Sequence, residues 1–267
     1  MSALALAVQD GAVIAKRNLI KIKRLPELLI WTTMSPIMFV VLFAYIFGSS
    51  IHIPGTSYRE YLIAGVFAQT VMFGSGFTGG GIAEDMTKGI IDRFRSLPMA
   101  RSAVLVGRTG GDVVYNAISV LVMTITGLIV GWRIHTGFDK AVWGFLLLLF
   151  FAYSISWIMA WVGLKVPSVE VVQNASFMVI FPATFIANTF VRASVLPGPL
   201  KVIAEWNPVS SVAQAVREAF GNTGTAPVPH VWSLENPILY TLIWAGVILA
   251  IFVPLSVRAY QKAASRQ

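Results

Sequence analysis

Three histidines are the side chains of this chain best suited to bind a metal or move a proton. His52, His135 and His230 lie far apart, and no H-E-x-x-H spacing brings two of them onto one helical face. No G-x-x-x-x-G-K-[ST] loop is present to hold nucleotide phosphates, and the positions of Ser, His and Asp suggest no hydrolytic triad. Cysteine is absent, so thiolate metal sites and disulfides are excluded. The sequence therefore predicts a protein that is not an enzyme and holds no cofactor.

One charged segment interrupts the apolar sequence and is suited to bind a partner. Residues 84–98 read EDMTKGIIDRFRSLP and stand between two long apolar runs. Ile90, Ile91, Phe94 and Leu97 recur at helical spacing among the charges, which predicts a short amphipathic helix. A protein in the aqueous phase could dock on such a helix, and the alternative is a charged loop that only faces water.

The composition places this segment in an integral membrane protein. The mean hydropathy is +0.74, and charged residues make up only 12% of the chain, about half the usual globular fraction. An apolar window of about 20 residues is long enough to cross a bilayer as a helix. Six such windows predict six transmembrane helices in an all-α protein: Leu28–Gly48, Tyr61–Ala83, Val113–Gly131, Ala141–Gly163, Val172–Val191 and Pro237–Val257.

The distribution of basic residues predicts the orientation of these spans. Six of the 20 basic residues would lie on one side of the membrane: Arg59, Arg133, Lys140, Arg192, Lys201 and Arg217. The other 14 would lie with both termini and the segment 84–108, which places that side in the cytoplasm. Topology and anionic lipid thus account for the net charge of +8, and no nucleic-acid partner is required. Asp112 is expected at the cytoplasmic start of the third span, where a carboxylate favours a helix N-terminus.

Two further segments are expected to lie at the membrane surfaces. Residues 1–27 carry an apolar helical stripe opposite lysines and arginines, which predicts an amphipathic helix along the inner surface; a simple positive-inside anchor is the alternative. Residues 192–236 are cut by prolines, and Val209–Phe220 is predicted to form a short helix capped by Ser210 or Ser211. Trp206 and Trp232 suit the level of the lipid headgroups, as would any ordinary aromatic belt.

Several of these motifs together resemble the permease subunit of ABC-2 type exporters, with most similarity to the daunorubicin-resistance branch. The resemblance rests on Ser35-Pro36 in the first span, on residues 83–101, and on Trp206-Asn207-Pro208 followed by Arg217 through Gly221. It covers nearly the whole chain, as one ABC-2 transmembrane domain of residues 1–267. It implies a second copy of this chain or a homologous permease, and two copies of a separate ATP-binding-cassette ATPase that binds ATP and Mg.

The resemblance also assigns roles to segments and residues. Residues 1–27 would be the interfacial helix, 84–110 the cytoplasmic coupling loop, and 192–236 a re-entrant extracellular gate. Contacts to the ATPase would come from Glu84, Asp85, Ile91, Asp92, Arg93, Phe94, Arg95, Leu97 and Pro98. The gate would include Trp206, Asn207 and Pro208. The substrate path would be lined by Phe67, Gln69, Met72, Phe73, Phe77, Phe177, Phe181, Phe185 and Asn188, although such residues also commonly pack on neighbouring helices or lipid.

The expected function is therefore that of a permease which moves a hydrophobic or amphiphilic drug, natural product or lipid out of the cell. The expected location is a bacterial plasma membrane, crossed several times with both termini in the cytoplasm. One alternative is an ABC-2 permease for a lipid-linked glycan or another lipid conjugate. Another, from a different class, is a membrane scaffold or sensor that transports nothing.

Overall fold

The computed structural model describes residues 26–48, 51–90, 103–166, 168–225 and 227–263, and nearly all of these form helices. An isolated bridge between Ile53 and Thr56 is the one β-type pairing in the described part of the chain. The helices are α2 (Pro26–Leu42), η1 (Phe43–Phe47), α3 (Tyr58–Thr87), α5 (Ala103–Val130), α6 (Phe138–Lys165), α7 (Val169–Ile186), η2 (Ala193–Val195), α8 (Gly198–Trp206), α9 (Pro208–Phe220), α10 (Trp232–Glu235) and α11 (Pro237–Ala263). The expected interfacial helix lies in residues 1–25, outside the described ones.

Five of the described helices are long and apolar enough to cross a membrane: α3, α5, α6, α7 and α11. The chain is thus a multi-pass membrane protein. The first predicted span corresponds to α2, which continues directly into the π-helical turn η1. Within this run, the apolar helical stretch is Pro36–Phe47, which is shorter than the five spanning helices. The number of six spans therefore stays a prediction.

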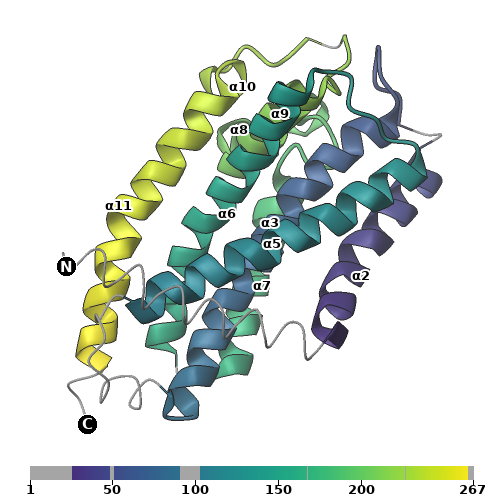
Figure 1. Ribbon diagram of the computed structural model, residues 1–267. Helices are drawn as coiled ribbons and strands as arrows, with labels where there is room; N and C mark the ends of the chain where they lie inside the picture. Colours follow the sequence, from purple (N-terminus) through teal and green to yellow (C-terminus); the bar gives the residue numbers. More distant parts are fainter. Residues whose placement is uncertain (1–25, 49–50, 91–102, 167, 226, 264–267) are drawn as a thin grey trace.

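Helix α3 is the centre of the bundle. It packs against α2, α5, α6, α7 and α9, and most of its side chains are buried. Helices α2 and α11 lie on opposite edges, and α8, α9 and α10 gather at one end (Figure 1). We call this the Tyr58 end, because α3 begins there, and the opposite end the Thr87 end.

Glycines allow the central helices to pack closely. Helices α3 and α6 cross at Gly79 and Gly163, and a Cβ on Gly163 would overlap the carbonyl oxygen of Gly79 and lie 3.0 Å from its Cα. A Cβ on Gly79 would lie 2.8 Å from the carbonyl oxygen of Met159. Small residues at a crossing bring two helix backbones into direct contact, which is a common way to join helices in a membrane.

The helices extend beyond the apolar windows at the Thr87 end. Helix α3 continues to Thr87, so Glu84 and Asp85 belong to its last turn, and α5 begins at Ala103 instead of Val113. Asp112 therefore lies in the third turn of α5 and not at its N-terminus. The predicted role of this carboxylate at a helix start is wrong, because the helix begins before the apolar window does.

Helix α7 ends earlier than predicted, at Ile186 instead of Val191. Residues 187–190 form turns, and all four of them are buried. A turn buried in an apolar interior must find partners for its backbone carbonyls. Here the partners are the guanidinium of Arg217 in α9 and the hydroxyl groups of Tyr58 and Tyr61 in α3.

Helix α9 forms close to where it was predicted, but with a different cap. Pro208 occupies its first turn, where no backbone N–H is needed, and Asn207 is the N-cap. The Asn207 side chain accepts a hydrogen bond from the backbone N–H of Val209 at 2.9 Å. The predicted cap by Ser210 or Ser211 is wrong, since both serines lie inside the helix and bond to other segments.

Candidate functional site

The guanidinium of Arg217 is the best-connected polar group of the Tyr58 end. It is fully buried. Its Nε donates to the carbonyl oxygen of Tyr61 at 3.0 Å, and Nη1 donates to Oδ1 of Asn188 at 3.2 Å. Nη2 donates to the carbonyl oxygens of Asn188 at 2.7 Å and Thr189 at 3.0 Å. We call these partners the Arg217 cradle; they join α9 to α3 and to the turn after α7.

The aromatic ring of Tyr61 completes this cradle. The guanidinium carbon of Arg217 lies 3.6 Å from the ring centre, a cation–π contact. The Tyr61 hydroxyl donates to the carbonyl oxygen of Asn188 at 3.1 Å, and the backbone N–H of Asn188 donates to the Ser210 hydroxyl at 2.9 Å. The backbone N–H, the backbone carbonyl oxygen and Oδ1 of Asn188 are thus all used in structural bonds.

Four of the residues predicted for the substrate path form one aromatic row. Phe73 of α3 contacts Phe177 of α7 with ring centroids 6.0 Å apart. Along α7, Phe177 contacts Phe181 at 5.1 Å, and Phe181 stacks on Phe185 at 4.1 Å. The row continues through Phe190, 4.8 Å from Phe185. The side chain of Phe177 is 56% exposed, so this row ends at the surface of the protein.

From Phe190 the aromatic contacts continue onto the first helix of the bundle. Phe190 stacks on Phe43 with centroids 4.6 Å apart, and Phe43 stacks on Phe47 at 5.1 Å. We call Phe73, Phe177, Phe181, Phe185, Phe190, Phe43 and Phe47 the phenylalanine row. It joins α3, α7 and η1 by continuous aromatic contacts without charge, and it reaches the surface at Phe177 and Phe47.

Other predicted path residues lie elsewhere. Phe67 is fully buried in the core against Trp132, Phe145 and Phe220, with centroids 5.5 to 5.9 Å apart. Met72 is buried in the same core cluster.

Gln69 and Phe77 differ from that buried apolar pair. Gln69 is 2% exposed, and neither atom of its amide has a hydrogen-bond partner among the described residues. It is the one path residue of α3 with spare hydrogen-bonding capacity. Phe77 is 41% exposed and contacts Tyr115 of α5.

The predicted gate residues join α8 to α9 at the Tyr58 end. Trp206 is 49% exposed, and its carbonyl oxygen accepts a hydrogen bond from the Tyr240 hydroxyl at 2.8 Å. The amide Nδ2 of Asn207 donates to the carbonyl oxygen of Ala183 in α7 at 2.7 Å. The Trp206-Asn207-Pro208 segment therefore connects α9 to both α7 and α11.

Of the residues predicted to contact the ATPase, only Glu84 and Asp85 are among the described residues. Glu84 and Asp85 occupy the end of α3, and Glu84 forms an ion pair with Lys88 at 2.6 Å. That hydrogen bond raises the pKa of the exposed Lys88 ammonium above its ordinary value. The remaining contacts predicted for the ATPase, Ile91, Asp92, Arg93, Phe94, Arg95, Leu97 and Pro98, lie outside the described residues.

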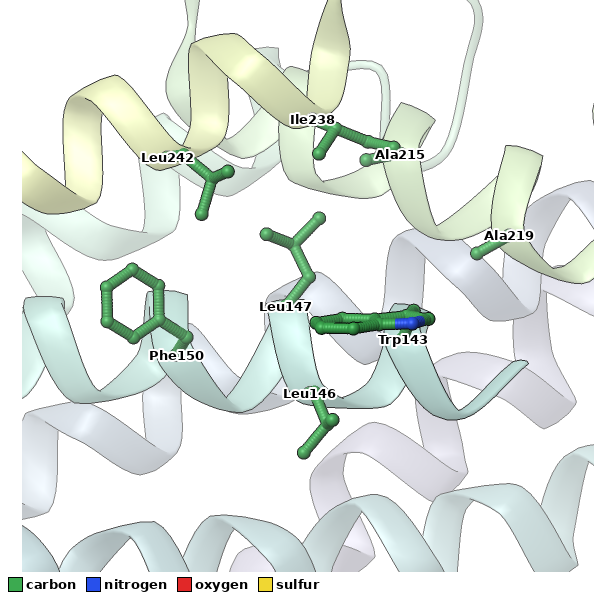
Figure 2. A pocket seen from close by; sticks show the side chains of 9 residues that line it. Trp143, Leu146, Leu147, Phe150, Ala215, Ala219, Ile238 and Leu242 are labelled. Carbon is green, nitrogen blue, oxygen red and sulfur yellow. The ribbon is translucent and has the colours of Figure 1, made fainter. Parts of the chain in front are cut away.

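An apolar pocket of about 320 Å³ lies between α6, α9 and α11. Figure 2 shows Trp143, Leu147 and Phe150 of α6 opposite Ala215 of α9 and Leu242 of α11. None of the residues predicted for the substrate path lines it. Helix α9 thus presents its small residues to this pocket and Arg217 to the cradle.

The sequence contains a signal for the burial of Arg217. The distribution of basic residues predicts only that Arg217 lies on the external side. Its neighbours in α9 include Val212, Ala213 and Val216, which are apolar on the same short helix. An arginine among such residues indicates a buried, paired guanidinium, because an unpaired one would be costly there.

The structure thus defines a helical membrane protein with the buried Arg217 cradle at the Tyr58 end and an uncharged row of phenylalanine side chains that joins α3, α7 and η1. Residues 11–220 match the ABC-2 type transporter family, and the chain belongs to that family.

The chain is also similar to named permeases. It is 32% identical over 245 residues to the daunorubicin resistance ABC transporter permease protein DrrB1 of Streptomyces coeruleorubidus, a match that covers 92% of this chain and 83% of that one. It is 23% identical to the probable doxorubicin resistance ABC transporter permease protein DrrC of Mycobacterium tuberculosis strain H37Rv, covering 86% and 80% of the two chains. A putative transport permease, ycf38 of Porphyra purpurea, is 19% identical, covering 93% and 84%.

Proposed function

We propose that this chain is the permease subunit of an ATP-driven exporter that moves a hydrophobic or amphiphilic drug across the membrane. The observation that carries the proposal is the 32% identity to DrrB1 over 92% of the chain. The geometry supports it, because the phenylalanine row offers an aromatic surface without charge, which suits such a cargo. A separate ATP-binding-cassette subunit would supply ATP hydrolysis, and a second copy of this chain or a homologous permease would complete the transport unit.

Export of daunorubicin tests this function. The chain is produced in a drug-sensitive bacterium together with an ATP-binding-cassette subunit that it captures, and the fluorescence of drug retained by the cells is measured over time. Cells with both subunits should retain less daunorubicin than cells with a variant ATPase that cannot hydrolyse ATP. Equal retention in the two strains would contradict drug export and would favour the scaffold or sensor alternative.

We further propose that residues 84–98 transmit the motion of the ATPase. In an aqueous docking helix, most binding energy comes from a buried anchor and a fixed charge. Phe94→Ala should therefore weaken capture of the ATPase by about 2 kcal/mol or more, and Arg95→Glu should add repulsion. The readouts are the amount of ATPase that co-purifies with the chain and the rate of drug export.

Phe138→Ala is the matched control for this pair of changes. Phe138 begins α6, and its side chain is 87% exposed. Capture and export should stay nearly normal in this variant. If the Phe94/Arg95 double variant also captures the ATPase normally at normal membrane abundance, the predicted helix in residues 1–27 becomes the better candidate for coupling.

The orientation of the chain is testable with single cysteines, because the natural chain has none. We propose that the Thr87 end faces the cytoplasm. Cysteines at Ser96 and Ser265 should then resist a membrane-impermeant thiol reagent in intact cells. A cysteine at Thr225, which is exposed in the loop after α9, should react. Reaction of the Ser96 variant from outside would reverse the proposed topology.

A further inference from the structure

A polar seam runs between α3 and α5 toward the Thr87 end. Arg108, Asp112 and Asn116 are spaced four residues apart on α5 and share one helical face. A Cβ on Gly74 of α3 would overlap Oδ1 of Asn116, and a Cβ on Gly81 would overlap the guanidinium of Arg108. Thr78 lies between these two glycines on the same face of α3 and therefore opposite Asp112. We call Thr78, Arg108, Asp112 and Asn116 the polar seam.

Several polar atoms of this seam are buried without a hydrogen bond. Thr78 is 0% exposed, Asn116 1% and Asp112 9%. Thr78 Oγ1, Arg108 Nε, Asp112 Oδ2 and Asn116 Oδ1 have no hydrogen-bond partner in the part of the chain that the structure describes. Arg108 Nε lies 3.6 Å from Asp112 Oδ2, which is an ion pair but too long for a hydrogen bond.

Such a concentration of unsatisfied atoms is unusual, because buried polar groups are nearly always bonded. Leaving them unpaired costs free energy in the closed arrangement. Separation of α3 from α5 at this end would give these atoms new partners and would relieve that cost. The unpaired atoms therefore lower the cost of opening the packing at the seam.

The charge of the seam limits what can bind there. Arg108 and Asp112 carry opposite charges, so the site is neutral as a whole. A cationic or an anionic group would meet one like charge and one opposite charge there, so neither gains a net attraction from the pair. An uncharged hydroxyl group can accept from Arg108 Nε and donate to Asp112 Oδ2 or Asn116 Oδ1, and an uncharged carbonyl group can accept from Arg108 Nε or the Thr78 hydroxyl.

An aromatic pair adjoins the seam. Phe77 and Tyr115, each next in sequence to a seam residue, contact each other with ring centroids 6.0 Å apart. Thr78 lies nine residues before the end of α3, or about 14 Å along the helix axis. A molecule dissolved in the membrane leaflet on this side could thus place an apolar part on the two rings and a polar part in the seam.

We infer that α3 and α5 part at the Thr87 end and that the polar seam then binds an uncharged hydrogen-bonding group of an amphiphilic cargo. The apolar part of that cargo contacts Phe77 and Tyr115. This inference rests on the proposed exporter function and adds a subsite to it. It concerns a different surface from the phenylalanine row between α3, α7 and η1.

Accessibility of a cysteine at Thr78 tests whether the seam opens. Thiols react as thiolates, which form in water and not in lipid. Membrane vesicles that hold the chain and its ATPase are treated with a negatively charged methanethiosulfonate reagent on the side of the Thr87 end. Val114→Cys is the matched control, because Val114 lies between two seam residues of α5 but is itself 38% exposed.

Thr78→Cys should react at least about tenfold faster than Val114→Cys, and daunorubicin should slow the reaction at Thr78. Equal rates at the two positions would overturn the inference, since the seam would not open to water. A rate at Thr78→Cys that daunorubicin leaves unchanged would overturn it as well, because the open seam would then not bind this cargo.

A second measurement removes one hydroxyl without changing the shape of the side chain. Thr78→Val should raise the KM for daunorubicin in drug-stimulated ATP hydrolysis several-fold, with the maximal rate unchanged. Thr126→Val is the control, because the Thr126 hydroxyl already donates to the carbonyl oxygen of Val122 within α5. Absence of daunorubicin export by the natural chain would contradict the proposed function. Normal export together with an unchanged KM in Thr78→Val would contradict only the subsite.

Discussion

Methionine in place of Arg217 is expected to destabilise the Tyr58 end of the bundle strongly. The variant would leave the carbonyl oxygens of Tyr61, Asn188 and Thr189 without the donors that they have now. Removing one partner of a buried charged network costs about 3–5 kcal/mol. In detergent, the temperature at which half of the protein is lost from the monodisperse peak should fall by about 10 °C.

Arg217→Lys separates the geometry of the guanidinium from its charge, and Arg133→Met is the control. Arg217→Lys keeps the cation but loses the planar fork that reaches two segments at once, so it should recover only part of the loss. Arg133→Met should change the midpoint little, because Arg133 is exposed and its guanidinium donates to the carbonyl oxygens of the nearby Leu128 and Trp132. A midpoint for Arg217→Met equal to that of Arg133→Met would refute the stabilising role of the cradle.

Alanine in place of Gly163 is expected to have an effect of similar size. The added methyl group would overlap the backbone of Gly79, which cannot move aside as a flexible side chain can. Overpacking a close contact costs about 1–3 kcal/mol and more where backbone must shift. The yield of folded protein after extraction, measured by size-exclusion chromatography, should fall clearly.

Gly246→Ala provides the control for this change. Gly246 lies within α11, and a Cβ at that position would meet no atom within 4 Å. Alanine also favours helix by about 1 kcal/mol over glycine, so this variant should be neutral or slightly stabilised. If both glycine variants give the same yield, direct backbone contact between α3 and α6 does not stabilise the bundle.

Hydropathy located the helices well but not their ends. An apolar window detects only the part of a helix that is suited to lipid, whereas the backbone hydrogen bonds of a helix continue through polar residues. Helix α5 begins ten residues before its window because Arg108 and Asp112 face α3 and not lipid. Helix α7 ends before its window does, because Arg217 binds carbonyl oxygens in the turn that follows.

The sequence predicts which candidate site residues lie together only where they recur at helical spacing on a single helix. Phe177, Phe181 and Phe185 recur every four residues, so their alignment on one face of α7 follows from the sequence. The sequence does not reveal which face of α3 meets α7. Phe67 packs in the core, whereas Phe73, six residues later, joins the phenylalanine row. The cradle joins residues 61, 188 and 217, and no local pattern reveals a contact over such separations.

The Arg217 cradle also limits how this end of the molecule can move. Its four hydrogen bonds are buried by protein, so breaking any one of them leaves a polar group without a partner. Helix α9, the start of α3 and the end of α7 must then travel together as one rigid body. A passage toward the Tyr58 side would then have to open between this rigid body and the helices around it, because α9 cannot move alone. Chemical cross-links between α9 and α3 should accordingly leave a transport cycle intact.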